Sequence, residues 1–158
     1  MARVSRHSKK VICGGILKMG IKEVVKKIKI KHGTNDPFEL CERLGIWVYI
    51  VPLGKAQGHY TYAKRKKVFF INQELSDVEK YFCCAHELGH ALLHTKNNVY
   101  FNSSNTFFIQ NKFENQANEF AAELLIDNDI LKKFEGYSLE KISECTSIDV
   151  KYLKLKFK

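Results

Sequence analysis

Two histidines and a glutamate lie close together in His86-Glu87-Leu88-Gly89-His90, an H-E-x-x-H pattern. Residues four positions apart on an α-helix lie one above the other, so both imidazoles can reach one ion at the roughly 2.0–2.1 Å of a zinc–nitrogen bond. Glu87 can then reach a water on the metal without occupying a coordination position. Zinc lowers the pKa of such a water, and a carboxylate can accept its proton. The pattern predicts zinc-assisted hydrolysis, with His86 and His90 as ligands and Glu87 as the catalytic base.

A third protein ligand is expected, because a catalytic zinc commonly has three and keeps one position open. Glu114 is the best candidate, since it lies 24 residues after His90 at the start of the next long helical pattern. Ala117 and Ala121 share its helix face, and their small side chains would let that helix pack closely on the histidine helix. The sequence therefore predicts His86, His90 and Glu114 as the metal-binding set.

Two alternatives to this assignment of Glu114 stay open. Glu114 could be the third residue of a helix whose N-cap is Asn111, in which case it would stabilise only the helix end. Another acidic side chain of the same helix, Glu119 or Glu123, could then supply the third ligand.

Other side chains near the motif could support the ligands or contact a substrate. His94 lies one turn beyond His90, about 6 Å further along the helix axis, which is too far for a site shared with His86, so it is expected beside the ligands or in the core. Asn118 or Glu123 could accept the remaining N–H of a ligand histidine. Tyr60 could polarise the carbonyl of a scissile bond, although an aromatic residue in a hairpin more commonly only packs.

Hydrophobic spacing indicates the elements that position these residues. Ser76 and Glu79 have the spacing of a capping box, and apolar residues then recur at helical spacing through the motif. A second long helix is predicted from about Lys112 to Ile126, after a polar segment, 97–111, expected to form an ordered loop or short strands. Upstream, the sequence predicts a helix, a second helix capped by Asp36, a β-rich run and a hairpin, at 21–30, 37–44, 46–53 and 60–71.

These elements predict an α+β fold, in which a small twisted β-sheet packs on zincin-like metal-binding helices. The expected organisation is a basic leader over 1–18, a metallopeptidase domain over 19–136 and a short C-terminal helical segment over 137–158 that resembles a degenerate helix-turn-helix. The length suits one ordinary domain with a core of its own.

Composition and charge narrow the class of protein. No apolar run approaches the roughly 20 residues of a membrane helix, and no signal peptide is recognisable. The five cysteines show no framework spacing, which favours reduced thiols in the cytoplasm. The net charge of +9 could attract nucleic acid or an acidic partner, but a solvated lysine-rich surface is the preferred explanation, and nucleic-acid binding is not favoured.

Four blocks of the sequence resemble the ImmA/IrrE family of metallopeptidases, which phages and other bacterial mobile elements carry. The blocks lie between Thr34 and Ile126, in the order and with the spacing of the family: TNDPFELCERLGIWV, FFIN, AHELGHALLH and ENQANEFAAELLI. The resemblance implies that His86, His90 and Glu114 bind zinc and that Glu87 is the catalytic glutamate. It also implies a cytosolic endopeptidase that cleaves a helix-turn-helix transcriptional repressor.

The sequence departs from the family at two places. Where members often have Met-Pro after E-L-L, this chain has Ile126-Asp127, so the end of that helix is expected to differ. The segment before Met19 has no recognised counterpart.

A second class of function is a basic binding module without catalysis, acting as an anti-repressor or on DNA through its last twenty residues. The intact H-E-x-x-H pattern favours the enzyme, because a pure binder has no need of Glu87. A metallohydrolase with a non-peptide substrate is also compatible with the motif.

Overall fold

The computed structural model describes residues 19–94 and 107–158, with the backbone alone for 107–110. The predicted leader, 1–18, and the polar segment before residue 107 lie outside the described residues. The first half of the chain contains α1 (Ile21–His32), α2 (Pro37–Arg43), β1 (Trp47–Val51), β2 (Gly58–Ala63) and β3 (Lys66–Asn72). The second half contains α3 (Asp77–Leu93), α4 (Phe107–Leu125), α5 (Ile130–Lys133), α6 (Leu139–Thr146) and α7 (Val150–Lys156). The predicted α+β class is confirmed.

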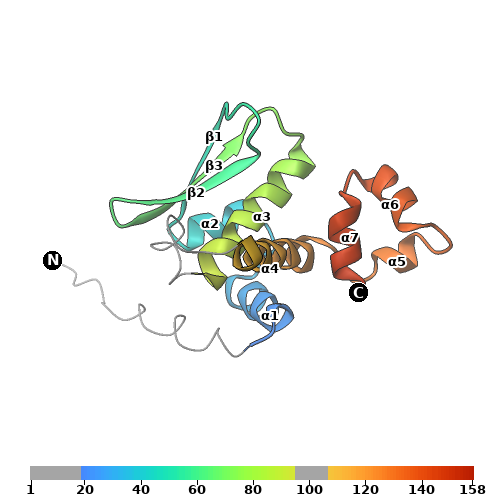
Figure 1. Ribbon diagram of the computed structural model, residues 1–158. Helices are drawn as coiled ribbons and strands as arrows, with labels where there is room; N and C mark the ends of the chain where they lie inside the picture. The colour runs from blue at the N-terminus through green and yellow to red at the C-terminus, as the bar shows by residue number, and fades with distance from the viewer. Residues whose placement is uncertain (1–18, 95–106) are drawn as a thin grey trace.

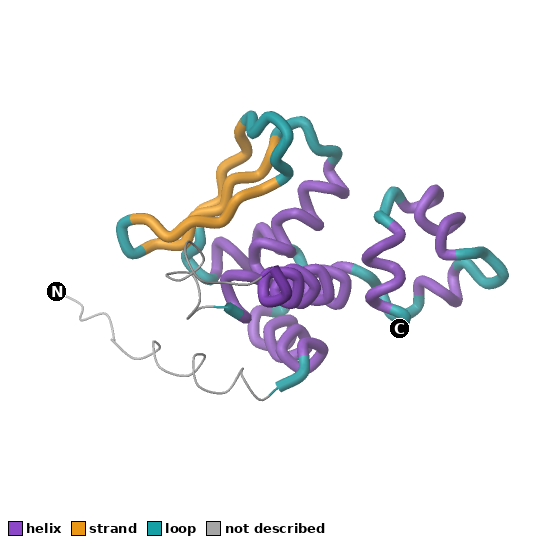
Figure 2. The backbone as a smooth tube through the Cα atoms, in the orientation of Figure 1, coloured by secondary structure: helices purple, strands orange, loops and turns teal. Residues whose placement is uncertain are grey.

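The three strands form one mixed sheet in the order β1-β3-β2 (Figures 1 and 2). β1 pairs with β3 in parallel, and β2 pairs with β3 as an antiparallel hairpin. Lys64 and Arg65 alone form the hairpin turn, and both have positive φ, the conformation that matches a two-residue loop to the twist of its strands. The side chains of Phe69 and Ile71 are fully buried under α3. β2 is left as an edge strand beside α3, among the described elements.

The helix that carries the motif begins where its sequence predicts. Ser76 accepts a hydrogen bond from the Glu79 backbone N–H, and the Glu79 carboxylate accepts one from the Ser76 N–H, which completes the capping box. Along α3, Cys84, Ala85, Leu88 and Ala91 are fully buried. α3 therefore lies inside the molecule, between the sheet and α4.

The predicted start of the second long helix is wrong. α4 begins at Phe107, inside the segment that was expected to form a loop or strands, and it runs to Leu125. Asn111 is consequently inside the helix and is no N-cap, so the capping role considered for Glu114 is wrong as well. Intrinsic propensity is only a weak guide to where a helix starts.

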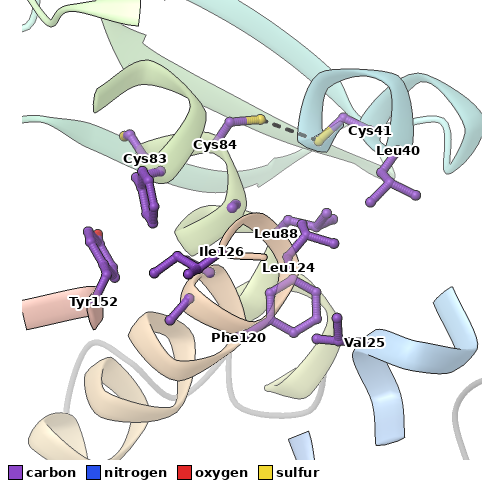
Figure 3. Packing of buried hydrophobic residues seen from close by; sticks show 14 of the residues in the cluster. Val25, Leu40, Cys41, Cys83, Cys84, Leu88, Phe120, Leu124, Ile126 and Tyr152 are labelled. Carbon is purple, nitrogen blue, oxygen red and sulfur yellow. Dashed lines mark hydrogen bonds between the residues drawn. The ribbon is translucent and has the colours of Figure 1, made fainter. Parts of the chain in front are cut away.

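The C-terminal helices share a core with the helices that carry the motif. Ile142 of α6 and Leu153 of α7 are fully buried and belong to the same apolar cluster as Phe120 and Leu124 of α4. Figure 3 labels Phe120 and Leu124 among the residues of this cluster. Tyr152 joins this cluster from α7. In the part of the chain that the structure describes, none of the helices combines the length and the apolar character needed to span a bilayer.

A buried ion pair joins α7 to α4. The Lys156 ammonium donates to Glu123 Oε2 over 2.7 Å, and both side chains are at most 8% exposed. The exposed Lys22 of α1 approaches the other oxygen, Oε1, at 3.5 Å. Lys29 of α1 donates to the backbone carbonyl of Glu123 over 3.1 Å. Positive charges from both ends of the described chain therefore converge on the last turns of α4.

Replacing Lys156 by Met is expected to lower the free energy of unfolding by about 3–5 kcal/mol, because it leaves the Glu123 carboxylate buried without its closest partner. Urea unfolding checks this. Lys154→Met is the matched control, since Lys154 pairs with Glu140 at the surface, with both side chains more than half exposed, and exposed pairs contribute about 0–1 kcal/mol. Equal effects of the two substitutions would contradict the structural role of the buried pair.

Candidate metal centre

Three potential ligand atoms meet between α3 and α4. His86 Nε2 lies 3.0 Å from His90 Nε2, and the two oxygens of Glu114 lie 3.3 Å from His86 Nε2 and 3.2 Å from His90 Nε2. A tetrahedral ion with bonds of about 2.0–2.1 Å separates neighbouring ligand atoms by roughly 3.3–3.4 Å. The spacing of these two imidazole nitrogens and one carboxylate therefore fits a zinc-sized ion. Within the described residues, this trio is the group of acidic, histidine and cysteine side chains close enough to hold a metal.

Close packing of the two helices brings the trio together. A Cβ atom on Gly89 would lie 3.1 Å from Ala117 Cα and 3.2 Å from Phe120 Cβ, so the absence of a side chain at Gly89 allows α4 to approach. Ala117 is fully buried at this contact, as the small-residue pattern of the sequence suggested. Glu114 lies one turn before Ala117 on the same helix and is thereby placed opposite the histidines.

Asn118 contacts one of the two histidines from α4. His86 Nδ1 lies 2.9 Å from Asn118 Oδ1. Because a carboxamide oxygen only accepts, Nδ1 carries the proton and donates it, which leaves the lone pair of Nε2 facing Glu114 and His90. Asn118 thus holds the imidazole in the tautomer and orientation that a metal ligand requires.

The two glutamates of the site, Glu114 and Glu87, have opposite pKa shifts. The close approach of the His86 and then the His90 imidazole holds the pKa of the Glu114 carboxyl well below its usual value, so that this half-exposed side chain stays ionised. Glu87 is 8% exposed, and burial raises its pKa, against the opposing effect of His86 and His90. The Glu87 carboxylate contributes no atom to the cluster of potential ligand atoms. Its carboxyl is therefore available to exchange a proton beside the metal-binding trio.

A cavity of about 790 Å³ opens over these side chains. His86, Glu87, His90 and Glu114 all line it, and the edge strand β2 lines it over 58–62. At the start of this strand, a Cβ on Gly58 would overlap the sulfur of Cys83 and lie 3.1 Å from Glu87 Oε1. Glycine at this position lets the edge strand pass directly over α3, next to the catalytic candidate.

Two other predicted site residues, His94 and Tyr60, lie near the trio but outside the ligand cluster. His94 is buried, with its ring 5.7 Å from that of His90 and 4.3 Å from that of Phe113, outside the ligand cluster. Burial lowers the pKa of His94 to about 4. Tyr60 lines the cavity and packs edge-on against Phe69, with ring centroids 5.5 Å apart.

The prediction that Glu123 orients a ligand histidine is wrong. Its carboxylate is bound by Lys156, so it belongs to the ion pair between α4 and α7. Helical periodicity explains the difference, because Glu123 is nine residues beyond Glu114 and half a turn out of phase with it. Glu119 is also absent from the clustered ligand atoms.

Sequence reasoning missed the contribution of α7 to the cavity. Lys151 and Tyr152 line it, although both belong to the segment interpreted as a separate helical appendage. Cys83 lies between these residues and β2, and burial raises the pKa of its thiol to about 12, so it stays protonated. No local pattern links Tyr152 to a motif more than sixty positions earlier, and only the packing of α7 on α4 reveals the proximity.

Comparisons with known proteins identify the family of the chain. The model of a peptidase family, the IrrE N-terminal-like domain, matches residues 41–155, from α2 through most of α7. The uncharacterized immunity region protein 2 of Bacillus phage phi105 is 33% identical over 141 residues, which cover 86% of this chain and 88% of that relative. Metallopeptidase ImmA of Bacillus subtilis (strain 168) is 32% identical over 128 residues, which cover 78% of this chain and 76% of that relative. The chain therefore belongs to the ImmA/IrrE family of metallopeptidases.

Proposed function

We propose that this chain is a zinc-dependent endopeptidase that cleaves a helix-turn-helix transcriptional repressor of a phage or other mobile element. The observation that carries the proposal is the meeting of His86, His90, Glu114 and Glu87 in one cavity beside an edge strand. The family membership supports a metal-dependent peptidase, and the donor set supports zinc.

The choice of zinc rests on the chemistry of the donors. Two imidazole nitrogens and one carboxylate oxygen form a three-ligand set typical of catalytic zinc, which keeps a further position for water or substrate. When bound there, zinc would lower the pKa of a water and polarise the carbonyl of the scissile bond. His86, His90 and Glu114 would hold it, with Asn118 orienting His86.

The chain's own residues supply the proton transfers and the substrate position. Glu87 accepts a proton from the attacking water and later returns it to the amine that leaves. Its raised pKa suits this exchange, because a base works best with a pKa near the operating pH. Among the described elements β2 is an edge strand, and such a strand suits an extended substrate that adds to the sheet by main-chain hydrogen bonds.

The substrate class is drawn from the relatives and the family resemblance. One relative is named for an immunity region of a phage and the other is named a metallopeptidase. A repressor that maintains such immunity is the protein whose cleavage would release silenced genes. Because a repressor acts on DNA inside the cell, we propose that the chain works in the cytoplasm.

Incubation of the purified protein with the repressor encoded by the same mobile element tests the proposal. We expect two repressor fragments by mass spectrometry, whose masses sum to that of the intact protein plus one water. A chelator should stop the reaction, and added zinc should restore it. A repressor that stays intact with the zinc-loaded protein would rule out this substrate.

Glu114→Ala is expected to lower the zinc content of the purified protein sharply, because it removes the one carboxylate of the trio. Glu114→Gln should also lose zinc, since an amide carries no charge to offset that of the ion. Glu119→Ala is the control on the same helix and should keep about the wild-type content. Metal analysis by atomic emission measures all three. Full occupancy in Glu114→Gln would place the third ligand elsewhere.

A further inference from the structure

Tyr152 brings a phenol group to the cavity from α7. Its side chain is 7% exposed and lines the same cavity as His86, Glu87, His90 and Glu114. In Figure 1, β2 and α7 lie on either side of α3 and α4. A substrate strand paired with β2 over α3 would therefore have its other side towards α7. No hydrogen bond of the Tyr152 hydroxyl to a described residue is present, and the hydroxyl is not among the buried polar atoms without a partner.

The ring of Tyr152 is held firmly in place. It stacks on Phe82 of α3, with ring centroids 4.3 Å apart and planes 28° apart (Figure 3 shows it beside Cys83). The next residue, Leu153, is fully buried. At the end of the same helix, Lys156 pairs with Glu123. α7 is thus attached to both helices that carry the metal-binding trio, which fixes the position of the phenol relative to them.

The hydroxyl of Tyr152 stays protonated at physiological pH. Burial raises its pKa, and electrostatic interactions with Cys83, Asp149, Glu114 and Glu87 add to the shift in that order. The geometric link between the phenol and the trio is the cavity that Tyr152 lines together with His86, His90 and Glu114. A neutral phenol in this place can donate a hydrogen bond to an oxygen that gains negative charge.

We propose that Tyr152 is a further catalytic residue, whose O–H donates a hydrogen bond to the oxygen of the scissile carbonyl. This inference rests on the proposed peptidase function. As the oxygen of water bonds to the carbonyl carbon, the second C–O electron pair moves onto the carbonyl oxygen, and Glu87 takes the proton of the water. The C–N bond then breaks, its electron pair stays on nitrogen, and nitrogen receives the proton from Glu87. The products are a carboxylic acid and an amine, and Tyr152 keeps its proton throughout.

Tyr60 is the competing phenol in the cavity. It belongs to the strand that would pair with the substrate backbone, and its ring packs on the sheet residue Phe69. Tyr152 lies on the side of the cavity that a strand paired with β2 leaves open. We therefore assign stabilisation of the carbonyl oxygen to Tyr152 and packing beside the substrate to Tyr60.

Steady-state kinetics of Tyr152→Phe on the same repressor test the assignment. The substitution removes the hydroxyl and keeps the ring on Phe82. We expect kcat to fall on the order of 10²–10³-fold, the typical cost of losing one donor to a developing oxyanion, with KM, zinc content and melting temperature unchanged. Tyr137→Phe is the control, since Tyr137 is 54% exposed and lies outside the residues that line the cavity.

A binding measurement separates this inference from the identity of the substrate. A phosphinic pseudo-peptide carries a tetrahedral anionic group in place of the reacting carbonyl, and calorimetry can measure its binding to zinc-loaded protein. Tyr152→Phe should weaken it roughly 10–100-fold, the value of one hydrogen bond to a charged group, and leave the affinity for the matching amide peptide unchanged. If the wild type cleaves no repressor but this difference persists, the proposed substrate fails and the role of Tyr152 stands.

Three outcomes would overturn the role of Tyr152. One is a Tyr152→Phe protein with wild-type kcat or wild-type phosphinate affinity. Another is a loss of kcat that follows a loss of zinc or of melting temperature, since that would indicate a structural role. The third is a loss of kcat and of phosphinate affinity in Tyr60→Phe but not in Tyr152→Phe.

Discussion

Protein in which His86 or His90 is replaced by Ala is expected to be purified without zinc, in contrast to about one ion per chain in the wild type. Each substitution leaves two of the three donors that meet between α3 and α4. Losing an outer hydrogen-bond partner of a ligand typically costs 10–100-fold in metal affinity, and losing the ligand itself costs more. Asn118→Ala, which removes the acceptor for His86 Nδ1, should therefore give an intermediate loss. Metal analysis gives the zinc content of each protein, and a competition titration with a coloured chelator gives the order of their zinc affinities.

Stability provides a second measure of the same prediction. A ligand that binds only the native state stabilises it, by about 2.7 kcal/mol when its free concentration is 100 times Kd. Wild-type protein should melt higher with zinc than with chelator, and the His86→Ala and His90→Ala proteins should show no such difference. His32→Ala is the control, since His32 lies at the end of α1, outside the ligand cluster. Unchanged zinc content in both histidine variants would disprove the site.

Local signals made much of the fold predictable from the sequence. The capping box of Ser76 and Glu79, the Asp36 cap before Pro37 and the hairpin at 60–71 each depend on residues close together in the sequence, and the structure contains all three. The helical spacing of His86 and His90 is also local. Such features can be recognised without knowledge of the tertiary structure, because neighbours in the sequence satisfy them.

Features that depend on distant contacts were not predictable in the same way. The start of α4 at Phe107 was not predicted. The partner of Glu123 is Lys156, 33 positions away, and helix periodicity alone cannot select it. Tyr152 reaches the cavity only because α7 packs on α4. The two histidine ligands could be predicted because they lie on one helix. The other residues that line the cavity come together only when β2, α3, α4 and α7 pack against one another.

The substitution Glu87→Gln is expected to abolish cleavage while the protein keeps its zinc and its fold. Glu87 lies at the trio but contributes no ligand atom. The amide has nearly the same size and fits the same buried space, but it cannot take a proton from water. General-base catalysis typically contributes 10²–10⁴-fold, so turnover should fall by at least that order. Single-turnover rates on the repressor, with zinc content measured in parallel, test this expectation.

The same variant distinguishes an enzyme from a binding module. If the chain cleaves its partner, Glu87→Gln should form a stable complex with an intact repressor, and immunoblots of cells that express both should show shortened repressor with the wild type only. If the chain acts by binding, both forms should relieve repression equally and leave the repressor whole. Glu79→Gln is the matched control, because this glutamate lies on the same helix and its capping role tolerates Gln. Relief of repression by Glu87→Gln with no cleavage by the wild type would therefore establish the binding alternative, whereas cleavage lost in Glu87→Gln and retained in Glu79→Gln would establish hydrolysis at this carboxylate.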